Sequence, residues 1–144
     1  MTLIRIIFAA LSMTVAAGTL QSQDVAAVVV ADPEPYAPIP AEGHTLDEYK
    51  WELRPLVIFA DTPEDRNFER QMALLLEDLP ALERRRVVIL VDTDPEAMTD
   101  IRRDLRPRGF SLVLIGLDGR VQLRKPAPWD VREITRSIDK SFEE

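Results

Sequence analysis

The sequence predicts an α/β domain with a central four-stranded mixed sheet, and three observations predict this fold class. Continuous apolar runs at residues 56–60 and 87–91 show no polar alternation, as expected of parallel strands covered on both faces. Apolar residues recur at helical spacing over residues 68–82, so a helix connects these strands, and Pro80 should kink or divide it. Asp118-Gly119 then separates two further strand-like segments, and this dipeptide is the strongest short signal for an antiparallel hairpin.

Helix-start signals place the other elements. Thr45 and Glu48 have the spacing of a capping box, which predicts a short helix through about Trp51. Asp94 followed by Pro95 predicts the start of a further helix after the second strand. Three residues should share the buried face of that helix: Met98, Ile101 and Leu105.

The last part of the sequence predicts the hairpin and a final helix. Strands at residues 110–115 and 120–124 flank the turn. In the second strand Val121 and Leu123 alternate with polar residues, which predicts an edge strand with one buried face. Asp130 opens the final helix with a capping box. The buried stripe of that helix should contain Val131, Ile134 and Ile138, and Phe142 extends it.

Residues 1–17 have the pattern of a cleaved secretory signal peptide. Arg5 precedes an apolar run that ends at Ala17, and Val15 and Ala17 are the small residues that signal peptidase reads. An uncleaved membrane anchor is the alternative, but a span needs about 20 apolar residues and this run is shorter. We therefore expect a periplasmic or secreted protein with no membrane span after cleavage.

Residues 18–44 are rich in Pro, Ala and Val and are expected to tether the domain. Prolines recur between residues 33 and 40, so neither a helix nor a central strand should persist there. His44, the only histidine, lies at the end of this segment, and a lone histidine is more often a surface residue than a metal ligand. The domain itself should cover residues 45–144.

The composition excludes several classes of function. The chain of 144 residues has 18 Lys and Arg against 25 Asp and Glu, a net charge of -7, whereas a nucleic-acid binder needs clustered cations. It has no cysteine, which removes disulfides, thiolate nucleophiles and cysteine-ligated metals. A single histidine leaves little from which to build a Ser-His-Asp triad. We therefore predict no catalytic residue, no cofactor and no nucleic-acid partner.

The order of predicted elements, β-α-β-α-β-β-α, is the layout of a thioredoxin-like sandwich. The pattern also contains more specific segments: Leu46-Asp47-Glu48-Tyr49-Lys50-Trp51, Arg54-Pro55 with the following strand, Gly109-Phe110, Leu114-Ile115-Gly116 and Asp118-Gly119. In these segments the chain resembles the domain-of-unknown-function family 4174, and the resemblance runs from Thr45 to about Asp139. This family occurs in exported bacterial proteins and in animal secreted proteins, including sushi-repeat-containing proteins and coiled-coil domain-containing protein 80. The resemblance implies a thioredoxin- or peroxiredoxin-like fold and no assigned activity.

The residues on which thiol redox catalysis depends are missing. In thioredoxin-like enzymes the reactive cysteine follows the first strand, at the start of the next helix, where the helix dipole lowers the thiol pKa. Here that loop is residues 61–65, which contains no thiol. Ser111 occupies the place before the third strand where thioredoxins keep a cis-proline. We therefore expect no thiol oxidoreductase activity.

Carboxylates follow the first two strands and should meet at the carboxyl edge of the sheet. They are Asp61, Glu64, Asp65, Asp92 and Asp94. A hard divalent cation could bind there, with Asp61, Asp92 and Asp94 as candidate metal ligands. In the alternative interpretation, Asp61, Thr62 and Asp94 cap helices, and Glu64, Asp65 and Glu96 complement helix dipoles. The second interpretation is favoured because helix starts select such residues in any case.

Three basic clusters and two tryptophans are candidates for contact with a partner. The clusters are Arg84 to Arg86, Arg102 and Arg103 with Arg106 and Arg108, and Arg120 with Arg124 and Lys125. Such runs are more often solvated faces at helix ends, although any of them could meet an acidic partner. An exposed tryptophan often anchors an interface. In a chain with few aromatic residues, however, Trp51 and Trp129 are expected to lie largely in the core.

Our leading hypothesis is an exported, non-catalytic thioredoxin-like module that binds another protein or peptide. One alternative is a divalent-metal-dependent enzyme or metal-binding domain that uses Asp61, Asp92 and Asp94. The other is a structural domain that binds no ligand. The sequence does not identify the partner or the oligomeric state.

Overall fold

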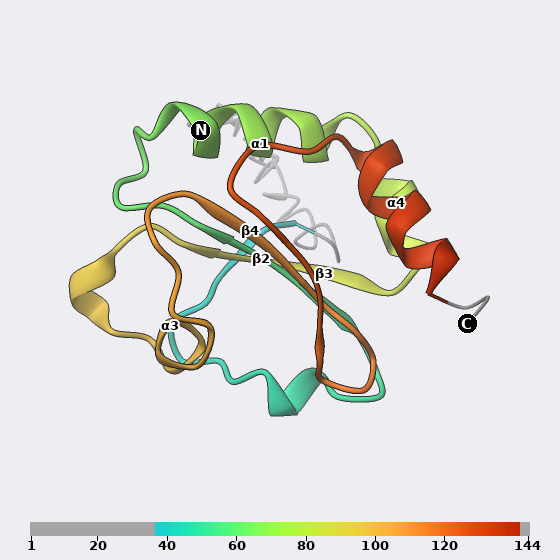
Figure 1. Ribbon diagram of the computed structural model, residues 1–144, viewed down its shortest axis with the longest axis horizontal. Helices are drawn as coiled ribbons and strands as arrows, with labels where there is room; N and C mark the ends of the chain where they lie inside the picture. Colours follow the sequence, from blue (N-terminus) through green and yellow to red (C-terminus); the bar gives the residue numbers. More distant parts are fainter. Residues whose placement is uncertain (1–36, 142–144) are drawn as a thin grey trace, which may run out of the picture. The chain divides into compact units, whose positions relative to one another are not determined.

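The computed structural model describes residues 37–141, which form a five-stranded mixed sheet with helices on both faces (Figure 1). The elements are β1 (Ile39–Pro40), η1 (Asp47–Tyr49), β2 (Arg54–Phe59), α1 (Arg66–Leu76), α2 (Leu79–Glu83), β3 (Val87–Asp92), η2 (Pro95–Ala97), α3 (Asp100–Leu105), β4 (Ser111–Ile115), β5 (Val121–Lys125) and α4 (Val131–Lys140). The predicted signal peptide, most of the predicted tether and Phe142 lie outside the described residues.

The strand order is β1-β3-β2-β4-β5. β2 pairs parallel with β3 and antiparallel with β4, and β4 continues into the antiparallel hairpin with β5, which confirms the predicted mixed sheet. The sheet has one strand more than predicted, because β1 pairs parallel with β3 and Ala41 donates a hydrogen bond to the Val91 carbonyl at 2.8 Å. β1 lies in the range predicted as a tether. A strand of two residues, the second of which is Pro40, shows no strand periodicity, so the sequence gives no signal for it.

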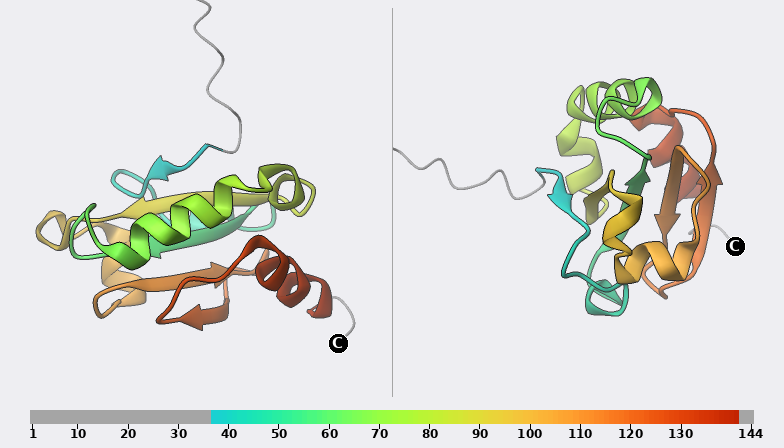
Figure 2. Two further views of the ribbon diagram at one scale, coloured as in Figure 1. Left: turned by 90° about the horizontal axis from the view of Figure 1, so that it is seen from above. Right: turned by 90° about the vertical axis from the view of Figure 1, so that its left-hand side faces the viewer.

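Helices cover both faces of the sheet (Figure 2), and an apolar core lies on each side of it. Leu56 and Ile58 of β2 pack toward α1, α2 and α4, whereas Val57 and Phe59 pack toward η1 and α3. All six residues of β2 are buried, which confirms the prediction of strands covered on both faces. The carboxyl ends of β2 and β3 lie side by side, with Phe59 opposite Asp92.

Two helices begin where the sequence signals predict a helix start or a break. The helical stripe is divided near Pro80, where the Asp78 side chain accepts from the backbone N–H of Ala81 and starts α2. The Asp130 and Glu133 side chains form the complete capping box of α4. The buried side chains of this helix include the three predicted residues Val131, Ile134 and Ile138.

Other local predictions are wrong. Only half of the first capping box forms, because Glu48 accepts from the Thr45 N–H while η1 is one short 3-10 turn. The helix predicted after Asp94 is two pieces, since Met98 has a left-handed φ of 46° and is exposed. Val121 is exposed because an irregularity in the β4–β5 register rotates the start of β5.

The two tryptophans differ from each other. Trp51 is 67% exposed, contrary to the prediction of a core position. It follows η1 with a φ of 69° and donates its backbone N–H to the Leu117 carbonyl, while Tyr49 takes the buried position of this turn. Trp129 is half-buried, and the Lys125 ammonium lies 4.4 Å from its ring centroid.

No helix within residues 37–141 is both long enough and apolar enough to cross a membrane.

Candidate functional site

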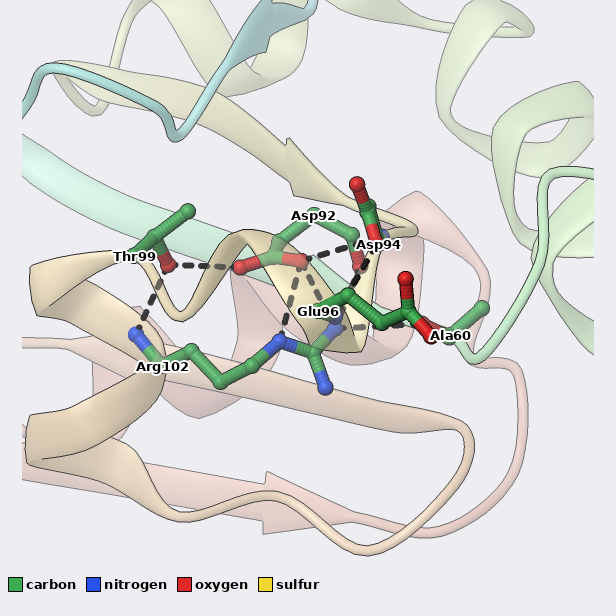
Figure 3. A network of polar contacts seen from close by, with 6 residues as sticks. All are labelled: Ala60, Asp92, Asp94, Glu96, Thr99 and Arg102. Atoms are coloured by element: carbon green, nitrogen blue, oxygen red, sulfur yellow. Dashed lines mark hydrogen bonds and ion pairs between the residues drawn. The ribbon is translucent and has the colours of Figure 1, made fainter.

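A buried ion pair joins the carboxyl ends of β2 and β3 to α3 (Figure 3). Arg102 donates to one carboxylate oxygen of Asp92 from Nη2 at 2.7 Å and from Nε at 3.0 Å. Thr99 donates its hydroxyl to the other oxygen of Asp92 at 2.6 Å and accepts the Arg102 backbone N–H at 3.0 Å. Both oxygens of Asp92 are therefore occupied by groups of the protein itself.

Arg102 also contacts β2 directly. Its Nη2 donates to the Ala60 carbonyl at 3.1 Å, and its guanidinium carbon lies 5.3 Å from the centre of the Phe59 ring. Arg102 is only 8% exposed, so the prediction that its cluster is a solvated face is wrong for this residue. The contact to Asp92 bridges ten residues and a loop, and no local sequence pattern signals such a pair.

Two of the other carboxylates predicted at this edge cap helices. Asp65 caps α1 by accepting from the N–H groups of Asn67 and Phe68 at 2.9 and 3.0 Å, and Asp94 caps η2 through Glu96. The cap of α1 is thus Asp65, and the prediction of Asp61 and Thr62 as helix caps is wrong. Across the described stretch 37–141, no three His, Asp or Glu side chains come together in a group that could hold a metal ion.

A cavity of about 420 Å³ opens beside the start of β4. Its lining consists of Arg106, Arg108, Phe110, Ser111, Arg124 and Pro126. These residues come from three places in the chain: the segment after α3, the first residue of β4, and β5 with the residue that follows it. Because Ser111 pairs with Phe59, the cavity lies near the end of β2. β2 is also the strand that precedes residues 61–65, the loop in which a thioredoxin-like enzyme would carry its reactive cysteine.

The three arginines of the cavity have no acidic counterpart in the part of the chain that the structure describes. Arg106 ends α3 with a left-handed φ of 47°, and its backbone N–H donates to the Arg102 carbonyl. Arg124 donates from Nη2 to the Leu105 carbonyl at 2.8 Å, which ties β5 to the end of α3. The cavity is therefore lined by cations that no carboxylate of residues 37–141 pairs with.

Ser111 contributes a hydroxyl to this cavity. The residue is 5% exposed, and its hydroxyl makes no hydrogen bond within residues 37–141. No fully enclosed polar side-chain atom of these residues lacks a partner, so the Ser111 hydroxyl is open to the cavity that it lines. Ser111 lies within the strand predicted over residues 110–115 and is the first residue of β4, and the described residues contain no cis peptide bond.

His44 lies in a small polar cluster at the edge of η1. Its Nδ1 is 2.9 Å from the Tyr49 hydroxyl and 3.1 Å from a Glu48 carboxylate oxygen. Burial, and to a lesser extent the charge of Glu48, raises the pKa of Tyr49. His44 thus connects two residues of the first short helix, although its ring forms no group that could hold a metal with other described residues.

Comparison with known proteins shows the fold and the family. The chain is similar to the reduced 2-Cys peroxiredoxin of Plasmodium vivax, at 18% identity over 68% of this chain and 82% of that one, with a TM-score of 0.54. It is also similar to the mitochondrial 2-Cys peroxiredoxin of Plasmodium falciparum, at 17% identity over 68% and 80% of the chains, with a TM-score of 0.48. No curated protein matches the sequence.

The first of these similarities supports the thioredoxin-like fold that the order of elements predicts, and at this identity it concerns the fold alone. The sequence profile of the family described as "Domain of unknown function (DUF4174)" matches residues 45–142, which is more than half of the chain. The chain therefore belongs to the DUF4174 family and has the thioredoxin-like fold that its resemblance to that family implies.

Proposed function

We propose that this chain is an exported, non-catalytic module that binds another protein or a peptide in the cell envelope or outside the cell. The observation that carries the proposal is the cavity beside the end of β2, which offers three arginines and a free serine hydroxyl to a ligand. This place is close to the position of the reactive thiol in thioredoxin-like enzymes, and the chain has no cysteine.

The lining of the cavity is suited to binding and poorly suited to catalysis. A serine acts as a nucleophile only when a neighbouring base takes its proton. The other lining residues are arginines, a phenylalanine and a proline, and none of these accepts a proton near neutral pH. Arginine instead donates hydrogen bonds in a fixed planar fork, which is the geometry of recognition.

The nearby buried ion pair does not supply the missing base. Both oxygens of Asp92 accept hydrogen bonds from Thr99 or Arg102, and the pair is almost completely removed from solvent. Proton transfer through Asp92 would leave the Arg102 guanidinium buried without its counter-charge. We therefore assign this pair to the stability of the domain and the cavity to its function.

The binding part of the proposal is tested by peptide-display selection on the purified full chain, followed by titration of the enriched peptides in solution. We expect related sequences to enrich in independent selections and to bind saturably without chemical change. If no peptide enriches above the uncoated support, the chain is better described as a ligand-free structural domain. Conversion of a bound peptide, detected by mass spectrometry, would contradict the non-catalytic assignment.

The export part of the proposal depends on the signal pattern of residues 1–17. It is tested by expressing the tagged chain in a bacterial host and measuring the intact mass and the N-terminal sequence of the protein in each cell fraction. We expect the mature protein to begin at Gly18 and to be absent from the cytoplasmic fraction. A chain that retains residues 1–17 in the cytoplasm would overturn this part and leave the binding proposal unaffected.

A further inference from the structure

We infer that the cavity formed by Arg106, Arg108, Phe110, Ser111, Arg124 and Pro126 is an oxyanion-binding site, and that its ligand is a carboxylate of an acidic, extended peptide segment. This inference rests on the proposed function and makes it more specific, because it names both the chemistry of the ligand and the residues that hold it. Neither the family profile nor the structural similarity assigns a ligand to this chain.

The first step is the sign of the charge in the cavity. Three guanidinium groups gather around one concave surface of a chain whose net charge is -7. Two arginines elsewhere on the domain are paired with carboxylates, Arg103 with Asp100 at 3.3 Å and Arg85 with Asp139 at 2.8 Å. A concave surface lined by one sign of charge focuses the electric field and attracts the opposite charge. The ligand should therefore be an anion.

The second step is the number of available donors. A guanidinium group has five N–H donors in a planar fork that matches a carboxylate or a phosphate. Arg124 uses its Nη2 on the Leu105 carbonyl, and this contact holds the side chain against the end of α3. The side chains of Arg106 and Arg108 make no hydrogen bond within residues 37–141, so their forks are available to a ligand.

The third step is the Ser111 hydroxyl, which points to the same ligand independently of the arginines. Polar groups that are largely removed from solvent nearly always have a hydrogen-bond partner. Ser111 is 5% exposed, lines the cavity, and has no partner in the described chain. A hydroxyl donor in the lining of a cationic cavity would complete the hydrogen bonding of an oxyanion.

The fourth step concerns the size of the ligand and its source. A volume of about 420 Å³ lies within the range of sites for small organic ligands and exceeds what a single bare ion needs. Arg124 belongs to β5, which is an edge strand of the sheet. Extended peptides commonly bind by adding a strand to such an edge. A peptide lying along β5 would bring an acidic side chain to the cavity, whereas a free anion would use the cavity alone.

One acidic side chain limits the charge of the cavity. The Asp61 carboxylate lies next to the backbone of Gly109. Gly109 stands in the sequence between Arg108 and Phe110, two residues that line the cavity. One carboxylate leaves an excess of two positive charges among the three arginines, so the region stays cationic. Asp61 should nevertheless weaken the attraction for an anion, and Asp61→Asn should strengthen binding.

The test is calorimetric titration of the purified full chain with four probes. They are inorganic phosphate, succinate, a six-residue peptide of alternating valine and aspartate, and the same peptide with asparagine in place of aspartate. We expect the acidic peptide to bind at least tenfold more tightly than its asparagine counterpart, and phosphate or succinate to compete with it. Binding should weaken with added salt, because the attraction is between charges.

Variants locate the binding. Arg106→Gln with Arg108→Gln removes two guanidinium groups that make no hydrogen bond or ion pair within residues 37–141. This double change should weaken acidic-peptide binding at least tenfold. Ser111→Ala should weaken it several-fold. The matched control is Arg84→Gln with Arg132→Gln, which makes the same change in charge at the C-cap of α2 and in α4. Neither residue lines the cavity, so this control should leave affinity unchanged. Circular dichroism confirms that each variant is folded.

The outcomes separate this inference from the proposed function. If the Arg106 and Arg108 changes do not alter peptide binding, the cavity is not the binding site. The proposal that the chain binds a peptide would still stand. If phosphate or succinate binds but neither peptide does, the cavity is an oxyanion site whose ligand is not a peptide. Absence of binding by all four probes would overturn the inference, whatever the display selection finds.

Discussion

Arg102 and Arg106 lie one helical turn apart at the end of α3, and the structure uses them in opposite ways. Arg102 is buried, pairs with Asp92 at 2.7 Å and donates to the Ala60 carbonyl. Arg106 is exposed on the wall of an open cavity, and its side chain has no partner within residues 37–141. The backbone itself connects the two residues, since the Arg106 N–H donates to the Arg102 carbonyl at 2.9 Å.

The difference follows from solvent access. A buried guanidinium group loses several kcal/mol of hydration, so the fold must supply a counter-charge and hydrogen-bond acceptors. A guanidinium group at a cavity wall keeps its water and does not need an internal partner. Arg102 should therefore matter for the stability of the domain, and Arg106 for what the domain binds.

The largest expected effect comes from breaking the buried pair. Asp92→Ala leaves the Arg102 charge buried without its partner, so the free energy of unfolding should fall by about 3–5 kcal/mol. For a domain of this size the melting temperature should fall by roughly 10 °C or more. Urea unfolding followed by circular dichroism measures the change. If Asp92 were instead a metal ligand, stability would barely change and cation binding would be lost.

Asp94→Ala is the matched control for this experiment. Asp94 is exposed and caps only the three-residue η2 through the Glu96 N–H at 3.0 Å. Removing an N-cap costs about 0.5–2 kcal/mol, and the low end applies to so short a helix. A loss as large as that of Asp92→Ala would show that the loop after β3, rather than the ion pair, limits stability.

Replacing both partners should have a smaller effect than removing one. Asp92→Leu with Arg102→Met puts apolar groups in place of the two charges, and such exchanges of buried pairs are often neutral or stabilising. We expect the double variant to regain most of the stability that either single variant loses. The Thr99 hydroxyl and the Ala60 carbonyl lose a partner, which should leave a residual deficit. Additive single losses would contradict a direct interaction.

The sequence predicted the parts of the fold that local patterns encode. The continuous apolar runs gave β2 and β3, the Asp118-Gly119 turn gave the hairpin, and the Asp130 capping box gave the start of α4. Each of these signals lies within a few neighbouring residues, so the local structure depends little on contacts with distant parts of the chain. β1 was missed because its two residues carry no periodicity and gain their pairing only from β3.

The site was harder to predict because it depends on contacts between distant residues. Arg102 and Arg106 belong to one basic cluster in the sequence, and only the position of Asp92 ten residues earlier separates their roles. The cavity also needs Arg124, which reaches it through the hairpin. The exposure of Trp51 likewise follows from a left-handed backbone conformation that no neighbouring residue signals.

A half-buried, paired arginine provides the intermediate case. Arg85, two residues after the end of α2, donates two hydrogen bonds of 2.8 Å to the Asp139 carboxylate of α4. The hydrogen bond from Arg85, together with its charge, lowers the pKa of Asp139 below its ordinary value. A lowered pKa in the folded state stabilises the fold above the ordinary Asp pKa of about 3.9, and this contribution is lost as the pH falls through the lowered value.

Asp139→Asn should therefore destabilise the domain slightly at neutral pH and by a diminishing amount below pH 4. Thermal unfolding of the wild-type chain and the variant between pH 2 and pH 7 measures this convergence. The effect should be well below that of Asp92→Ala, since water screens an exposed pair. Two curves that stay parallel down to pH 2 would show that the hydrogen bonds matter and the charge of Asp139 does not.

The smallest effect on stability should come from the arginines of the cavity. Arg106→Gln with Arg108→Gln removes no contact that the domain makes within residues 37–141, so the free energy of unfolding should change by less than about 0.5 kcal/mol. At low salt the double change should raise the free energy of unfolding slightly, because Arg106, Arg108 and Arg124 repel one another around one cavity. This increase should disappear at high salt, which screens the repulsion. Urea unfolding at two salt concentrations measures both quantities. A loss of more than 1 kcal/mol would mean that these arginines support the fold as Arg102 does, and the division between structural and binding arginines would have to be abandoned.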